Sequence, residues 1–110
     1  GTVFYIAPEV QEGKEYNAKA DMFSLGVCLF ELWHPPFGTA HHRALVLSAL
    51  CRDCKFPEEF EKAVPDDVIK ILKVLLDHEP SNRPTAQGLL MSPLLPQSVK
   101  QQELNRILNI

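Results

Sequence analysis

The chain has 110 residues, of which 45% are hydrophobic, so it is long enough for one small packed domain and too apolar for a disordered segment. Its 14 acidic residues outnumber its 11 basic residues, and the net charge of −3 argues against a nucleic acid or an anionic membrane surface as the main partner. The most apolar stretch, residues 22–33, is about half as long as a membrane span.

The first predicted helix spans residues 21–33 and follows an irregular start, 1–17, with at most one helical turn at 8–11. Asp21 stands where a carboxylate can cap the free N–H groups of this helix. Gly26 costs about 1 kcal/mol relative to alanine, which predicts a close packing contact there. Apolar residues occur on almost every side, which indicates a buried central helix. They are Met22, Phe23, Leu25, Val27, Leu29, Phe30, Leu32 and Trp33.

A second helix is predicted over residues 40–51. The His-Pro-Pro run at 34–36 ends the preceding helix, and Thr39 is the expected N-cap of this one. Its apolar residues include Leu45, Leu47 and Leu50. We expect a loop over residues 55–65.

Two further helices complete the predicted core. The third starts at Asp66 or Asp67 and is stopped by Pro80, and the fourth runs from 85 to 90 with Thr85 as its cap. The apolar residues of the third share one face. They are Val68, Ile71, Leu72, Leu75 and Leu76. For residues 99–110, one alternative is a last, amphipathic helix. The chain is therefore expected to be mainly α, with no clear strand.

The three cysteines, Cys28, Cys51 and Cys54, are an odd number, which suits a reducing compartment. Cys51 and Cys54 have C-x-x-C spacing, and His41 and His42 lie nearby. A structural zinc site needs about four ligands and there is no second cysteine pair, so free cytosolic thiols are the favoured interpretation and no metal site is predicted.

Three motifs follow one another along the chain. Residues 1–9 read Gly-Thr-Val-Phe-Tyr-Ile-Ala-Pro-Glu, and residues 21–32 contain Asp-Met-Phe-Ser-Leu-Gly-Val and then Phe-Glu-Leu. Residues 77–86 read Asp-His-Glu-Pro-Ser-Asn-Arg-Pro-Thr-Ala. In order and spacing they resemble the end of the activation segment, the buried central helix and the loop before the last helix of a eukaryotic protein kinase. Phe23 replaces the usual Trp, and Glu79 the commoner Asp.

The resemblance covers residues 1–95 and implies the C-terminal part of the kinase large lobe, an incomplete domain with the end of the activation segment and about four to five helices. Residues 96–110 would then form a post-kinase segment, with a short amphipathic helix as an option. The runs 24–43, 56–57 and 89–96 are similar to the kinases of the translation initiation factor two alpha subunit, of the amino-acid-starvation (general control non-derepressible) type.

This resemblance implies that the intact parent is a cytoplasmic serine/threonine kinase that uses ATP and magnesium in a stress response, with the initiation-factor subunit as its protein substrate. The alternative is a catalytically silent kinase-like domain that regulates a partner. The chain itself lacks the Gly-rich loop, the V-A-I-K lysine, and the H-R-D and D-F-G motifs. We therefore expect no catalytic residue, no bound cofactor, no membrane or nucleic-acid contact and no activity in this chain alone. The resemblance leaves open whether the intact parent is a homodimer.

The resemblance also assigns residues. Those expected at the substrate are Gly1, Thr2, Tyr5, Thr39, His42 and Arg43. Thr2 would lie beside the catalytic aspartate and favour Ser or Thr substrates, and it is also a candidate phosphorylation site; the alternative is an ordinary loop threonine. Residues 39–50 correspond to the helix on which these kinases dock their protein substrate, with Thr39, His42 and Arg43 exposed. A solvated helix face is the alternative.

Five residues are expected to support the active site: Ala7, Pro8, Glu9, Asp21 and Arg83. Glu9 and Arg83 would form a buried, two-bonded ion pair between the activation segment and the base of the lobe. Two solvated surface charges are the alternative. Asp21 would accept N–H bonds from the catalytic loop, which lies outside this sequence, unless it only caps its helix.

Overall fold

The structure is a computed structural model that describes residues 2–94, with side chains from Phe4 onward. This part of the chain consists of helices joined by turns and contains no strand, in agreement with the mainly α prediction. In chain order the elements are η1 (Thr2–Tyr5), α1 (Pro8–Gln11), α2 (Ala18–Trp33), α3 (Ala40–Asp53), α4 (Glu58–Ala63), α5 (Asp66–Leu75), η2 (Pro80–Asn82) and α6 (Ala86–Leu90). The predicted post-kinase segment, 96–110, lies outside the described residues.

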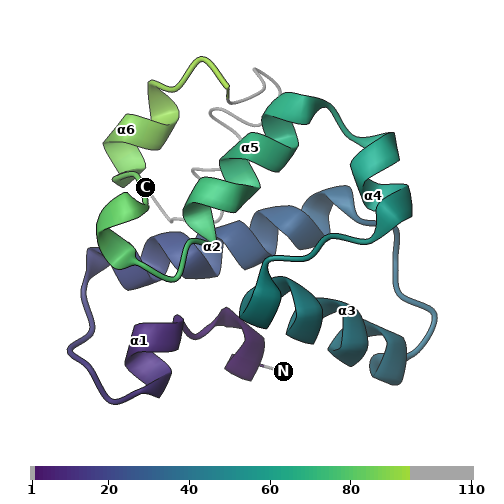
Figure 1. Cartoon of the computed structure of the whole chain (residues 1–110), viewed down its shortest axis with the longest axis horizontal. Helices are drawn as coiled ribbons and strands as arrows, with labels where there is room; N and C mark the ends of the chain where they lie inside the picture. The colour runs from purple at the N-terminus through teal and green to yellow at the C-terminus, as the bar shows by residue number, and fades with distance from the viewer. Residues whose placement is uncertain (1, 95–110) are drawn as a thin grey trace.

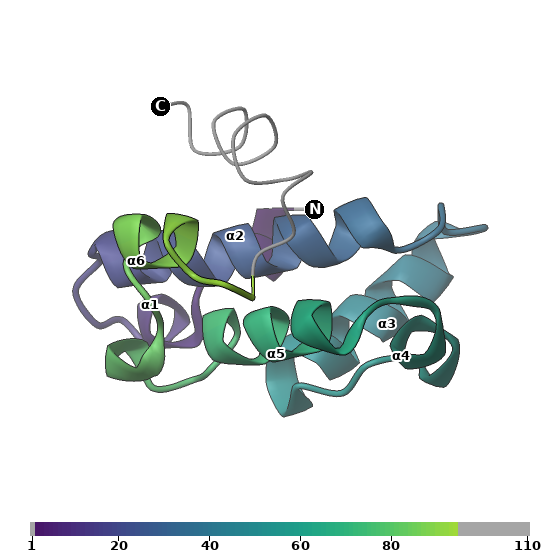
Figure 2. The same ribbon diagram turned by 90° about the horizontal axis from the view of Figure 1, so that it is seen from above.

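Helix α2 runs through the middle of the molecule, with α1 and α3 on one side of it and α5 and α6 on the other (Figure 1). It contacts η1 at one side and α5 at the other, and the view from above shows α5 against α2 again (Figure 2). Two opposite sides of α2 therefore meet other elements, which explains why apolar residues occur on more than one side of this helix.

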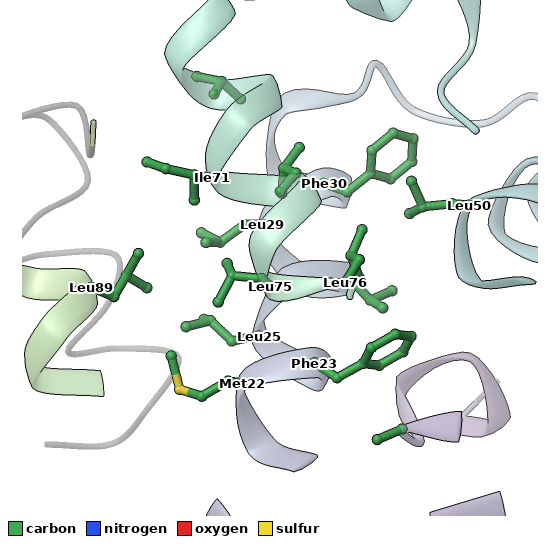
Figure 3. Close-up of a cluster of buried hydrophobic side chains, with 14 of the residues drawn as sticks. Met22, Phe23, Leu25, Leu29, Phe30, Leu50, Ile71, Leu75, Leu76 and Leu89 are labelled. Carbon is green, nitrogen blue, oxygen red and sulfur yellow. The ribbon is translucent and has the colours of Figure 1, made fainter. Parts of the chain in front are cut away.

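The core lies mainly between α2 and α5, and α3 adds Leu47 and Leu50 while α6 adds Leu89 (Figure 3). Its largest side chains are at most 3% exposed, and each contributes roughly 1.5–3 kcal/mol relative to an exposed position. Those labelled in Figure 3 are Met22, Phe23, Leu25, Leu29, Phe30, Leu50, Ile71, Leu75, Leu76 and Leu89, and Leu47, Phe60 and Leu72 are buried to the same degree. The last turn of α2 departs from the prediction of full burial, because Leu32 is 46% exposed.

Gly26 allows α2 and α5 to approach each other closely. A Cβ atom at this position would lie 2.9 Å from the Leu75 Cβ and 3.0 Å from the Leu76 Cδ2. Real Cβ atoms essentially never come that close to a neighbour, so glycine is required by the spacing of the two helices. The close contact predicted from the sequence is confirmed.

Helix α2 begins three residues before the predicted start. Its N-cap is Asn17, whose side-chain oxygen accepts a hydrogen bond of 2.9 Å from the Lys19 N–H. The prediction that Asp21 caps this helix is therefore wrong: Asp21 lies inside the first turn, where its charge still complements the helix dipole. Asparagine is among the best N-cap residues, and Ala18 and Ala20 favour helix strongly.

Helix α3 has the predicted cap, and the loop expected after it contains a helix. The Thr39 hydroxyl accepts a hydrogen bond of 3.0 Å from the His42 N–H. The helix ends at Asp53, and the left-handed backbone of its C-cap Cys54 (φ 51°) lets the Lys55 N–H reach the Ala49 carbonyl at 3.3 Å. Within the predicted loop, α4 is stabilised by Phe60, which is 3% exposed and packs with its ring centroid 4.6 Å from that of Phe30.

Helix α5 starts at Asp66 and buries the predicted apolar face, but it ends at Leu75, before Pro80 is reached. The Asp77 carboxylate explains this early end, because its Oδ1 accepts the Glu79 N–H at 2.9 Å and so offers the backbone a turn instead of a helix. Thr85 caps α6 as predicted, by accepting the Gly88 N–H at 3.0 Å. None of the helices in the described part of the chain is long and apolar enough to cross a membrane.

Candidate functional site

A buried ion pair connects two motifs that lie 74 residues apart. Arg83 donates from Nη1 to Glu9 Oε2 and from Nη2 to Glu9 Oε1, both at 2.8 Å. The two residues are 1% and 6% exposed. The hydrogen bonds from Arg83 hold the pKa of the Glu9 carboxyl below its ordinary value, although burial opposes this shift. The predicted two-bonded pair is confirmed, and the alternative of two solvated charges is excluded.

The rest of the Arg83 guanidinium also has partners. It donates from Nη1 to the Lys19 carbonyl at 2.9 Å and from Nε to the Asp77 carbonyl at 2.8 Å. Its carbon lies 5.2 Å from the centre of the Phe23 ring. Arg83 therefore joins α1, the start of α2 and the loop after α5 through one side chain. Among the described residues, no buried side-chain nitrogen or oxygen lacks a hydrogen-bond partner.

The Ala-Pro-Glu triplet starts α1 and brings Glu9 to this pair. Ala7 is 1% exposed and has an extended backbone, and its carbonyl accepts the Val10 and Gln11 N–H groups. Pro8 occupies the first helical position, where its missing N–H costs nothing and its fixed φ favours the helix. Glu9 is thus held by a short but well-defined helix, with its carboxylate directed at Arg83.

A second polar cluster connects η1, α2 and α3. The Tyr5 hydroxyl donates to Glu31 Oε1, Arg43 Nε donates to Glu31 Oε2 at 3.0 Å, and Arg43 Nη2 donates to the Tyr5 oxygen at 3.0 Å. The Arg43 and Glu31 side chains are 27% and 22% exposed. Burial and the Glu31 carboxylate raise the pKa of Tyr5, and Glu31 raises that of Arg43. We call Tyr5, Glu31 and Arg43 the polar triad.

The triad changes the interpretation of two predicted site residues. Tyr5 and Arg43 come together with each other and with Glu31, and Arg43 is half-buried, so the expectation that it is exposed is wrong. Sequence reasoning missed Glu31. Its signal was a single acid near the end of an otherwise apolar helix, since a half-buried carboxylate needs a partner.

The remaining predicted site residues belong to neither the Glu9–Arg83 ion pair nor the polar triad. Thr39 and His42 are exposed at the start of α3, and Thr39 is engaged as its cap. Asp21 is exposed and accepts a hydrogen bond from the Tyr16 hydroxyl. Thr2 lies in η1, and Gly1 is outside the described residues.

The cysteines form no disulfide with one another, and all three are half-buried. Burial raises the pKa of the Cys51 thiol to about 11, so at neutral pH it is protonated and a poor nucleophile or metal ligand. Within residues 2–94, no group of three or more His, Cys, Asp or Glu side chains could hold a metal ion.

The sequence is similar to those of known proteins. The family model of the protein kinase domain matches residues 1–95. The chain is 43% identical over 115 aligned positions to "eIF-2-alpha kinase GCN2" of Rattus norvegicus, covering 99% of this chain and 7% of the relative. It is 40% identical over 111 positions to the GCN2 kinase of Arabidopsis thaliana, covering 100% of this chain and 9% of the relative.

A third relative is "Eukaryotic translation initiation factor 2-alpha kinase 1" of Rattus norvegicus, 45% identical over 94 positions, with 86% of this chain and 15% of the relative covered. The chain thus spans only a small part of the length of these relatives. The matched range includes the Glu9–Arg83 pair and all three elements of the polar triad. The chain therefore belongs to the protein kinase domain family, as a helical part of the large lobe similar to the GCN2 type.

Proposed function

We propose that the intact protein is a cytoplasmic serine/threonine kinase that transfers the γ-phosphate of ATP to the alpha subunit of translation initiation factor two. The observation that carries this proposal is the buried Glu9–Arg83 pair, which fixes the end of the activation-segment motif onto the helical base. Such a pair, with every guanidinium nitrogen bonded, makes the position of that segment well defined. The names of the relatives support the choice of substrate.

In this proposal, the chain contributes positioning rather than phosphoryl transfer. ATP and magnesium, held by other parts of the intact kinase, supply the phosphoryl group and neutralise its charge. Thr2, in η1, would accept the substrate hydroxyl beside the catalytic aspartate, and Asp21 would accept N–H bonds from the catalytic loop. The exposed carboxylate of Asp21 accepts one hydrogen bond from Tyr16, and its other oxygen has acceptor sites for that second role.

Helix α3 would hold the folded protein substrate at a distance from the reacting hydroxyl. Two features support this role. Leu45 is 58% exposed on the same helix that buries Leu47 and Leu50, so its apolar side chain is accessible to a partner. A hollow of about 520 Å³ lies beside the start of the helix, with Trp33, Phe60 and the exposed His42 among its lining residues. Such remote contacts add binding energy without changing the chemical step.

The proposal is tested with the intact kinase, magnesium-ATP, the purified initiation-factor subunit and a generic serine peptide. We expect transfer to a serine or threonine of the subunit, with a higher kcat/KM than for the peptide. If the correctly folded protein transfers phosphate to neither the subunit nor the peptide, the alternative of a catalytically silent regulatory domain is favoured.

Docking on α3 is tested separately with Leu45→Ala, and Val74→Ala is the matched control because Val74 is an aliphatic residue of α5 that is 41% exposed. We expect Leu45→Ala to raise KM for the protein substrate several-fold and to leave peptide phosphorylation unchanged, since about 1.4 kcal/mol of lost contact is a factor of ten. Equal effects of the two variants on the protein substrate would rule out docking at Leu45.

A further inference from the structure

The polar triad is a closed ring of hydrogen bonds contributed by three elements. Tyr5 comes from η1, Glu31 from the last turn of α2 and Arg43 from the first turn of α3. Each member touches both others, so removal of any one takes away one hydrogen-bond partner from each of the remaining two. The two charges also cancel within the ring.

The Arg43 guanidinium is directed at its own chain. Its Nε and Nη2 donate to Glu31 at 3.0 and 3.4 Å, and Nη2 also donates to Tyr5. Its carbon lies 5.7 Å from the centre of the Phe4 ring, so the planar group faces a second residue of η1. Two of the three guanidinium nitrogens, Nε and Nη2, are therefore engaged by residues of the same chain in a half-buried pair.

Helix α3 contacts η1 at a second point. The Cys51 thiol lies 3.5 Å from the Phe4 carbonyl oxygen, two helical turns after Arg43. In Figure 1, α3 lies beside the short helix at the start of the chain. Contacts at both points fix the direction of α3 relative to η1, so the two elements are expected to move together.

We propose that Arg43 is a positioning residue, which with Glu31 holds η1 in place through Tyr5 and so supports phosphate transfer to every substrate. This inference rests on the proposed function, because η1 is the segment expected to face the reacting hydroxyl. It differs from a docking role for Arg43, which would affect the protein substrate alone.

The test uses the intact kinase with Arg43→Gln, Arg43→Lys and the control Arg52→Gln, an exposed arginine on the same helix. Arg43→Gln is expected to lower kcat by roughly tenfold or more on both the protein substrate and a serine peptide, with little change in KM. Arg43→Lys is expected to recover only part of the rate, since an ammonium can pair with Glu31 but lacks the planar fork that also reaches Tyr5. Arg52→Gln should match the wild type.

A double-variant cycle tests whether Arg43 and Glu31 act on kcat through the same hydrogen bonds of the polar triad. Glu31→Gln alone and Arg43→Gln with Glu31→Gln should lower kcat about as much as Arg43→Gln alone, because all three break the same ring. Three results would each overturn the inference. The first is a loss of kcat in the double variant that equals the product of the two single losses. The others are an effect of Arg43→Gln on KM for the protein substrate alone, and kinetics of Arg43→Gln that match those of Arg52→Gln.

A second measurement keeps the inference testable if the intact protein transfers no phosphate, which would refute the proposed function itself. Amide hydrogen exchange of residues 2–6 should be faster in Arg43→Gln than in Arg52→Gln, because η1 would lose its contact with α3. Equal exchange in the two variants would show that Arg43 does not hold η1.

Discussion

Arg83 connects α1, the start of α2 and the loop after α5 through one side chain. Its side chain is buried, carries a full charge and satisfies it with the Glu9 carboxylate and with two backbone carbonyls, those of Lys19 and Asp77. A buried guanidinium without such partners would lower the free energy of unfolding by several kcal/mol, so the fold requires these bonds. The same set of bonds fixes the activation-segment motif to the helical base.

Replacement of Arg83 by Ala should therefore destabilise the intact kinase domain by about 3–5 kcal/mol, because it leaves Glu9 buried and unpaired. Arg83→Lys should recover little, since lysine cannot make two parallel bonds to one carboxylate. Urea unfolding measures the difference. Lys62→Ala is the control, because Lys62 pairs with Glu58 on the surface and its loss should change the midpoint little. Equal shifts for Arg83→Ala and Lys62→Ala would contradict the buried-pair account.

Glu9 gives a pH dependence with a defined sign. Its pKa is lowered in the folded state from an ordinary value of 4.5, mainly by the hydrogen bonds from Arg83. The resulting stability is present above pH 4.5 and is lost as pH falls through the folded-state pKa. Unfolding of the wild type and of Glu9→Gln between about pH 7 and about pH 3 should show a difference that is largest near neutrality and shrinks in acid. A difference that grows as pH falls would reverse the sign and refute the assignment.

At the scale of elements, helix caps decide where several helices begin, and one of them carries two assignments. Thr39 caps α3 and is also a predicted substrate contact. Thr39→Ala should lower the unfolding free energy by about 1 kcal/mol through the lost cap, whereas Thr39→Asn should retain it. If Thr39→Asn keeps the stability but raises KM for the protein substrate, Thr39 also touches the substrate. Thermal unfolding that ranks Thr39→Asn below Thr39→Ala would exclude the capping role.

The contact of α2 with α5 leads to a prediction that opposes helix propensity. Alanine favours a helix by about 1 kcal/mol over glycine, yet Gly26→Ala should destabilise the domain by about 1–3 kcal/mol, because the added Cβ would overlap Leu75. Gly38→Ala is the matched control, since nothing lies within 4 Å of a Cβ there. Denaturant unfolding that shows Gly26→Ala to be more stable than the wild type would mean that the two helices can separate without cost.

Four of the helices were predictable because their signals are local. Thr39 and Thr85 mark their starts as caps, and apolar spacing alone gave the buried face of α5. Helix α4 was not predictable in this way, since it has only 6 residues and no side-chain cap. It depends on the burial of Phe60 against Phe30, a tertiary contact.

The candidate site was predictable only where a family resemblance supplied it. No spacing rule pairs Glu9 with Arg83 across 74 residues, and the resemblance supplied that pair. The polar triad combines separations of 26, 12 and 38 residues, so it depends on how η1, α2 and α3 pack. Helical periodicity does not contain that information, and Glu31 was missed for this reason.

At the scale of the whole molecule, we propose that the described residues form a base that holds two functional surfaces. One is η1 with α1, fixed by Arg83 and the polar triad, and the other is the exposed side of α3. The sequence contains none of the motifs that hold ATP, magnesium or the catalytic aspartate. The central claim is therefore that this chain positions the substrate and does not perform the transfer.

The most direct test compares the intact protein with the 110-residue chain in one assay with labelled ATP, magnesium and the initiation-factor subunit. We expect the intact protein to transfer phosphate to the subunit, and the isolated chain to transfer none and to bind ATP negligibly, because the lysine and aspartate motifs of transfer lie outside it. Clear transfer by the isolated chain, or none by a correctly folded intact protein, would contradict the account.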